Sequence, residues 1–160
     1  MRYSGLVKND FANGKGVCVS LFTQGCPHRC KGCFNPETWD YDGGKEVPAD
    51  LSQQIIQAIS ANGIQRNFSV LGGEPLCPEN RIFVNNIINE VKEAYPTIKI
   101  CIWTGYTLEA LKKENNAIIN NILSNINVLI DGPYIDELRD LTLELRGSKN
   151  RKIRYHGIDF

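Results

Sequence analysis

The stretch Val17-Cys18-Val19-Ser20-Leu21-Phe22 decides the fold class, because it is the first of four short apolar runs that each end at an unusual loop. It is rich in β-branched and aromatic residues and lies between Gly16 and Gly25, a composition that predicts a strand. The segment Cys26-Pro27-His28-Arg29-Cys30-Lys31-Gly32-Cys33 begins just after this strand. A predicted strand therefore leads directly into a loop with three cysteines.

Strands are also predicted at residues 67–71, 99–103 and 128–130, and helices alternate with them. Apolar residues recur at helical spacing over residues 50–59, 80–95 and 108–113, with further helix around residues 118–123. Strands that alternate with helices favour a parallel sheet with right-handed crossovers. Four such units cannot close an eight-stranded barrel. The predicted fold class is therefore α/β, with an open, partial (βα) barrel.

Length and composition predict one domain that stays in the cytoplasm. The chain of 160 residues has no linker, so we expect a single domain over residues 1–160, with a core at about 10–135 and a tail at 136–160. The 18 Lys and Arg balance the 18 Asp and Glu, which argues against a nucleic-acid partner, and the basic run at 146–154 is interpreted as solvated or partner-facing. The apolar runs are too short for a signal peptide or a membrane span. Six cysteines in such a chain favour a metal site over disulfides.

The unusual segments follow the predicted strands, and parallel α/β sheets bind their ligands at the carboxyl edge. These segments are the cysteine loop (residues 26–33), Gly72-Gly73-Glu74-Pro75, Thr104-Gly105-Tyr106 and Asp131-Gly132-Pro133-Tyr134. We therefore expect all four to converge on one rim.

The spacing of Cys26, Cys30 and Cys33 is C-x3-C-x2-C. Three thiolates at these gaps can reach three corners of a four-iron cube, which usually takes four cysteines, so one iron would stay open to a ligand. A thioredoxin-like pair of Cys30 and Cys33 would leave Cys26 unexplained.

Two alternatives close the site with a fourth protein ligand. In a zinc site the fourth ligand would be His28, His156 or Cys77. If Cys77 completed an iron–sulfur cluster instead, the protein would be an electron carrier. Otherwise we expect His28 to be a solvated loop residue, and Cys18 and Cys101 to be small apolar core residues.

Gly72-Gly73-Glu74-Pro75 places two flexible residues beside a carboxylate at the end of a strand. Backbone carbonyls and the Glu74 carboxylate could meet an ammonium group there, although the same residues also suit a simple turn. Trp103 and Tyr106 could stack on a ring at the same rim, and Asp131 is interpreted as a turn residue.

The cysteine loop followed by Gly-Gly-Glu-Pro resembles the radical S-adenosylmethionine superfamily. Further segments, over about residues 10–151, resemble the activating proteins of anaerobic, class III ribonucleotide reductases. These segments are Asp10-Phe11-Ala12-Asn13-Gly14, Gln24-Gly25-Cys26, Cys33-Phe34-Asn35-Pro36-Glu37-Thr38-Trp39, Trp103-Thr104-Gly105-Tyr106, Asp131-Gly132 and Arg146-Gly147-Ser148 followed by Asn150. Residue 151 is Arg here, where that family usually has Gln.

The resemblance implies a [4Fe-4S] cluster whose open iron is chelated by S-adenosylmethionine. It assigns the cluster to Cys26, Cys30 and Cys33, and places Gly32, Cys33, Phe34, Gly72, Gly73 and Glu74 beside the cofactor. It also implies reductive cleavage of the cofactor to methionine and a 5′-deoxyadenosyl radical. That radical would create a glycyl radical on the large reductase subunit, with a flavodoxin or ferredoxin as electron donor. An activase of another glycyl-radical enzyme, or a ferredoxin-like carrier, is the alternative.

Overall fold

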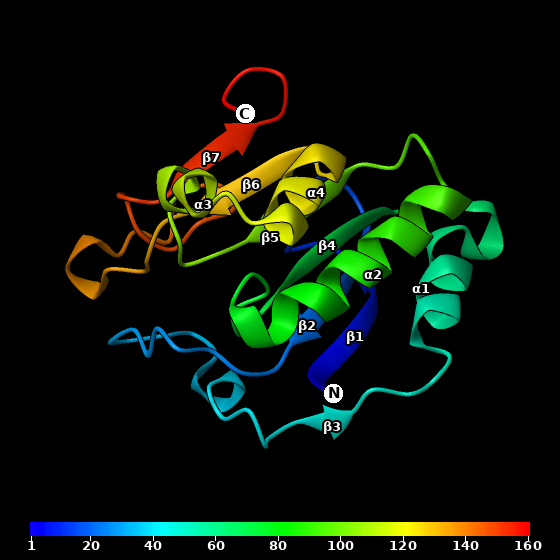
Figure 1. Cartoon of the computed structure of the whole chain (residues 1–160), viewed down its shortest axis with the longest axis horizontal. Coiled ribbons are helices and arrows are strands. Elements are labelled where there is room, and N and C mark those ends of the chain that lie inside the picture. Colours follow the sequence, from blue (N-terminus) through cyan, green and yellow to red (C-terminus); the bar gives the residue numbers. More distant parts are fainter.

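Seven strands form one mixed sheet in the order β3-β1-β2-β4-β5-β6-β7 in the computed structural model, which describes residues 1–160 (Figure 1). The four central strands are parallel to one another, and the outer strands pair antiparallel. The central strands are β2 (Cys18–Thr23), β4 (Asn67–Gly72), β5 (Ile100–Trp103) and β6 (Val128–Asp131). The predicted α/β class and all four predicted strands are thus confirmed.

Four helices connect the parallel strands and lie in front of the sheet in Figure 1. They are α1 (Leu51–Ile59), α2 (Pro78–Ala94), α3 (Leu108–Glu114) and α4 (Ala117–Asn125). Because the parallel strands are adjacent in chain order, right-handed crossovers place every helix on the same face of the sheet. Between that face and the helices lies a cluster of 24 buried residues. The predicted helices are confirmed.

The outer strands were not predicted from the sequence. They are β1 (Arg2–Asp10), β3 (Lys45–Glu46) and β7 (Lys152–Tyr155). In β7 the charged residues Lys152 and Arg154 alternate with Ile153 and Tyr155, and this is the composition of a short edge strand that resists further pairing. The high charge of the tail concealed this alternation. Part of the tail therefore forms the edge strand next to β6.

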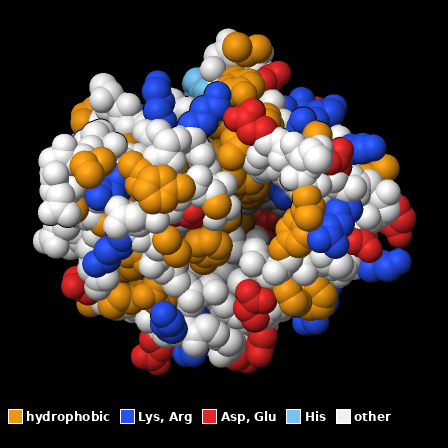
Figure 2. Space-filling model, turned by 180° about the vertical axis from the view of Figure 1, so that it is seen from behind, with side chains coloured by type: hydrophobic (Ala, Val, Ile, Leu, Met, Phe, Trp, Pro, Cys, Tyr) orange, Lys and Arg blue, Asp and Glu red, His pale blue; other side chains and the backbone are white.

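Short 3-10 helices complete the chain: η1 (Pro36–Thr38), η2 (Ala61–Gly63) and η3 (Asp136–Leu138). None of the helices combines the length and the apolar character that crossing a membrane requires. The face of the sheet opposite the helix-covered core has polar and small strand residues, including Cys18, Ser69 and Cys101, which line a cavity of about 500 Å³. Seen from behind, the molecule is hollowed near its centre, and hydrophobic side chains surround the hollow (Figure 2).

Candidate functional site

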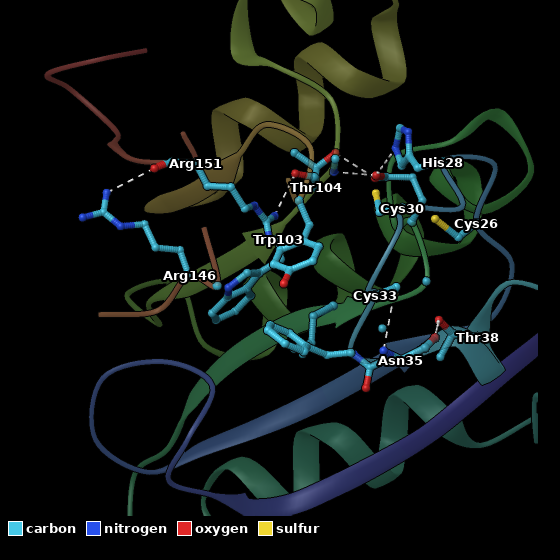
Figure 3. Close-up of a pocket in the computed structure, with 18 of the residues that line it drawn as sticks. Cys26, His28, Cys30, Cys33, Asn35, Thr38, Trp103, Thr104, Arg146 and Arg151 are labelled. Atoms are coloured by element: carbon cyan, nitrogen blue, oxygen red, sulfur yellow. Dashed lines mark hydrogen bonds and ion pairs between the residues drawn. The ribbon is translucent and has the colours of Figure 1, made fainter. Parts of the chain in front are cut away.

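The four rim segments do converge, as expected from the strand order. A cavity of about 350 Å³ lies beyond the carboxyl ends of β2, β4 and β5. It is lined by all three loop cysteines, by Gly72, Gly73 and Glu74, and by Phe34, Trp103 and Thr104. Tyr134 lines it after β6, whereas Tyr106 and Asp131 do not. Figure 3 shows the side chains of the three loop cysteines, Trp103 and Thr104 around one space.

The cysteine loop is held against the chain that follows it. The backbone N–H groups of Gly25 and Cys26 donate to the carbonyls of Thr38 and Trp39, at 2.7 and 3.2 Å. Cys26 is buried, and Cys30 and Cys33 are partly exposed. The backbone N–H of Asn35 lies 3.4 Å from the Cys33 Sγ and donates to it. A bond of this kind to a ligating sulfur helps to set the electronic properties of an iron–sulfur site.

No three His, Cys, Asp or Glu side chains gather at a single-ion site. The three loop thiols share a cavity without converging on one point, an arrangement that suits a cube because each thiolate binds a different iron. Burial raises the pKa of the Cys26 thiol to about 11. A metal centre bound there would displace the thiol proton, because thiolate is the ligating form.

Glu74 is the centre of a saturated hydrogen-bond network. Its carboxylate is buried and accepts from the Leu76 N–H at 2.9 Å, the Thr104 hydroxyl at 2.8 Å and the Gly105 N–H at 2.7 Å. The fourth contact is with the His28 Nε2, at 2.7 Å. Since a carboxylate offers about four acceptor positions, none is left for a ligand. Glu74 therefore joins the loops after β2, β4 and β5.

His28 corrects one expectation. It is not a solvated loop residue, because its ring contacts the buried Glu74 carboxylate and packs edge-on against Tyr106 at 4.7 Å between ring centroids. No local pattern predicts this pairing, since the two partners are 46 positions apart. One of its two ring nitrogens, Nε2, is thus engaged.

Cys77 is directed away from the cavity. It is fully buried, its thiol donates to the Glu74 carbonyl at 3.2 Å, and it receives a contact of 3.7 Å from the Tyr41 hydroxyl. His156 lines the cavity of about 500 Å³ on the face of the sheet opposite the helices, and it packs against Phe160. Neither Cys77 nor His156 lines the cavity of the three cysteines, and His28 lines it with its Nε2 held by Glu74. The geometry therefore favours a site with an open position.

Comparisons with known proteins agree with this geometry. Residues 12–154 match the family model described as a 4Fe-4S single cluster domain. The chain is 38% identical over 154 residues to the anaerobic ribonucleoside-triphosphate reductase-activating protein of Vibrio cholerae, covering 96% of this chain and 97% of that protein. It is 34% identical over 156 residues to the protein of the same name from Escherichia coli K12, covering 97% and 99%. The chain belongs to this family of activating proteins. The member from phage T4 is 35% identical over 153 residues, covering 96% and 93%.

In this member of the activating-protein family, the tail segment (residues 139–151) forms the remaining wall of the cavity. Leu141, Leu145, Arg146, Gly147 and Arg151 line the space. The Trp103 indole N–H donates to the Leu145 carbonyl at 2.7 Å, which fastens the segment to the end of β5. No role in the site was predicted for these residues, although Arg146 and Gly147 belong to a motif noted in the sequence.

Phe34 lies where the cysteine loop meets the tail segment. Its ring is half exposed and packs against Tyr134 at 5.0 Å between centroids, and the Arg139 guanidinium lies 5.5 Å from the ring centre. A side chain at Gly147 would collide with this ring. The absence of a side chain at Gly147 therefore leaves room for the Phe34 ring in its observed position at the cavity.

Asp131 has a structural role that the sequence did not show. Its carboxylate accepts from the Leu108 N–H at 2.8 Å, at the start of α3, and from the Arg154 Nε at 3.1 Å on β7. The interpretation as a residue of the Asp-Gly-Pro turn is wrong in this respect. The carboxylate instead joins β6 to a helix and to the edge strand.

Proposed function

We propose that this chain is a radical S-adenosylmethionine activase that generates a glycyl radical on an anaerobic ribonucleoside-triphosphate reductase. One observation carries the proposal: the three loop thiols and Gly72-Gly73-Glu74 line the same cavity, while the only nearby fourth thiol, Cys77, faces away. When bound and reduced, the cluster would supply one electron that breaks the sulfonium C–S bond of S-adenosylmethionine. The products would be methionine and a 5′-deoxyadenosyl radical, which takes a hydrogen atom from a reductase glycine.

Cys26, Cys30 and Cys33 would hold the cluster, and the donor set fits it. Thiolates are the ligands that iron–sulfur clusters take in proteins, and three of them leave one iron open. The Asn35 N–H donates a hydrogen bond to the Cys33 Sγ and would stabilise negative charge on that sulfur. Hydrophobic and aromatic side chains, among them Phe34, Trp39 and Trp103, supply walls that limit the access of water.

Cys33, Phe34, Gly72, Gly73 and Glu74 would form the side of the cavity that receives S-adenosylmethionine. Gly32 does not line the cavity and lies close against the Asp136 side chain, so its part beside the cofactor stays a prediction. The Gly73 carbonyl accepts no hydrogen bond within the protein, so it can accept from an ammonium group. Because the Glu74 side chain is saturated, its part is to fix the loop that presents this carbonyl. The backbone therefore binds the amino group, and the Glu74 carboxylate positions the backbone.

We also infer that residues 1–160 form a single radical S-adenosylmethionine domain, in which the open sheet corresponds to the partial (βα) barrel of that superfamily. The four parallel strands in consecutive order, β2-β4-β5-β6, support this inference. The names of the relatives support an anaerobic ribonucleoside-triphosphate reductase as the target, and its large subunit as the protein substrate stays a prediction. A flavodoxin or ferredoxin as electron donor, and a cytoplasmic location, stay predictions.

The test is the formation of 5′-deoxyadenosine by anaerobically reconstituted protein with S-adenosylmethionine and a strong one-electron reductant. The assay is run with and without the reductase subunit, and electron paramagnetic resonance detects the glycyl radical in that subunit. We expect cleavage of the cofactor and a radical signal that depends on the subunit. An intact cluster without cleavage in either mixture would indicate an electron carrier instead. Cleavage with a radical only on another glycyl-radical enzyme would change the partner.

A further inference from the structure

The charges on the cavity wall do not balance. Glu74, Arg146 and Arg151 are the lining residues of fixed formal charge, and the Glu74 carboxylate is saturated by its four contacts. Neither arginine lies within ion-pair distance of a carboxylate, since the ion-paired arginines are Arg81 and Arg154. Two cations therefore border the cavity without a counter-ion.

Arg151 is the arginine that points into the site. In Figure 3 its side chain extends toward Thr104 and the cysteines, whereas the Arg146 side chain points away from them. The Arg151 Nη2 donates to the Thr104 carbonyl at 3.0 Å and to the Ile130 carbonyl at 3.4 Å. These carbonyls lie just after β5 and within β6, so the guanidinium is held at the carboxyl edge of the sheet.

Part of the Arg151 guanidinium has no partner. Its Nε is buried and makes no hydrogen bond, and the Arg146 Nε is in the same condition. Burial lowers the pKa of Arg151 from its usual value, and the nearby Glu74 charge opposes that shift. A guanidinium still stays protonated in a protein. The result is a permanent positive charge that is partly desolvated beside the cysteine loop.

Arg154, three positions along the chain, differs from Arg151 because its guanidinium is neutralised by carboxylates. It pairs with Asp131 at 3.1 Å and with Glu109 at 2.8 Å. An unpaired, partly buried charge is costly, and the cost is recovered when an anion completes the site. The Glu74 and Asp131 carboxylates also lie near Arg151, but each already has its own hydrogen-bond donors. The remaining negative charges near Arg151 are those of Cys30 and Cys33 as thiolates, together with a cluster bound to them.

We propose that Arg151 is a redox-tuning residue, whose fixed positive charge stabilises the one-electron-reduced state of the cysteine site and raises its midpoint potential. This inference rests on the proposed function, because it requires the loop to hold a cluster. A low-potential donor supplies the one electron. This donor is a flavodoxin or ferredoxin, or dithionite in the experiment, and no bond forms or breaks. Reduction adds negative charge to the site, and a nearby cation in a medium of low dielectric constant favours the more negative state.

The test is a potentiometric titration of the reconstituted protein without S-adenosylmethionine, followed by electron paramagnetic resonance of the reduced cluster. Arg151→Gln removes the charge, Arg151→Lys keeps it, and Lys152→Gln removes a neighbouring charge that is exposed to solvent. We expect Arg151→Gln to shift the midpoint to a more negative potential. Arg151→Lys should restore most of the difference, and Lys152→Gln should leave the midpoint unchanged, because water screens an exposed charge.

Equal midpoints for wild type and Arg151→Gln, at equal iron content, would overturn the inference. A shift that Arg151→Lys does not reverse would also overturn it, because the effect would then come from altered packing. If Arg151→Gln fails to assemble a cluster, Arg151→Met, which keeps a long stem, provides the neutral variant. Failure of the proposed function is distinguishable, since then the wild-type protein would assemble no cluster or would cleave no cofactor.

Discussion

The two walls of the cavity are built in different ways. On one side, the cysteine loop and the loop after β4 meet at Glu74, whose carboxylate has a donor at every acceptor position. On the other side, the tail segment presents Arg146 and Arg151, each with a buried Nε that has no partner. The first wall saturates its carboxylate within the protein, and the second leaves the charge of Arg151 beside the cavity without a carboxylate partner.

This difference separates positioning from electrostatics. Groups that are saturated by the fold cannot gain a new bond to a ligand, so their contribution is to hold the backbone in place. Groups that the fold leaves unpaired are the ones whose energy changes when a charged cofactor enters. Changes in the first wall should therefore appear mainly as lost stability or lost assembly, and changes in the tail segment as altered properties of an assembled site.

The largest expected effect concerns the thiols of the first wall. Cys26→Ala, Cys30→Ala and Cys33→Ala should each abolish 5′-deoxyadenosine formation, because a cube held by two thiolates loses a corner. Cys77→Ala is the matched control, since that thiol is buried outside the cavity, and the variant should retain cleavage. Cleavage at the wild-type rate by any of the three loop variants would contradict the assignment of the ligands.

The next effect tests the saturation of Glu74. Glu74→Gln replaces one carboxylate oxygen by an N–H₂ group, which would face either the donors of Leu76 and Thr104 at Oε1 or the Gly105 N–H and the His28 ring at Oε2. We expect a loss of about 2–3 kcal/mol in the free energy of unfolding, because hydrogen bonds to a buried charge are among the stronger ones. Urea denaturation of the cluster-free protein under reducing conditions measures it.

Glu79→Gln provides the control for that experiment, since Glu79 is exposed on the first turn of α2. A surface change of this kind should stay within about 0.5 kcal/mol. If Glu74→Gln were as mild as Glu79→Gln, the description of Glu74 as the fixed centre of the first wall would be wrong.

A smaller effect tests the close approach of the two loops in the same wall. A Cβ at Gly73 would collide with the carbonyl oxygen of Gly25, whereas a Cβ at Gly5 would meet no atom. Gly73→Ala should therefore reduce the free energy of unfolding by about 1–2 kcal/mol through forced backbone shifts. Gly5→Ala should not. Equal stability of the two variants in the same denaturation experiment would show that the loops can separate at little cost.

The sequence predicted the first wall much better than the second. Cys26, Cys30, Cys33 and Gly72-Gly73-Glu74 were found because each group lies just after a strand with a clear apolar pattern, and strand ends share one edge in a parallel sheet. The saturation of Glu74 was not predictable, since its partners His28 and Thr104 are 46 and 30 positions away. Local patterns indicate where a loop lies, but not which donors fill a carboxylate.

The tail segment was missed for a related reason. Its position depends on single long-range contacts, such as those of Trp103 with Leu145 and of Arg151 with Thr104, which leave no periodic trace in the sequence. Its high charge also resembled a solvated surface. The unpaired Nε groups of Arg146 and Arg151 become visible only when the tail is placed over the carboxyl edge.

The smallest effect compares the two tryptophans that line the cavity. The Trp103 indole N–H donates to Leu145, and the Trp39 indole N–H is buried without a partner. Trp103→Phe should therefore cost about 1 kcal/mol through the lost hydrogen bond and should increase hydrogen exchange across residues 139–147. Trp39→Phe loses comparable apolar area but no hydrogen bond, so exchange in the tail segment should not change. If both variants increased exchange equally, general packing at the cavity would hold the tail segment, and the single bond from β5 would not.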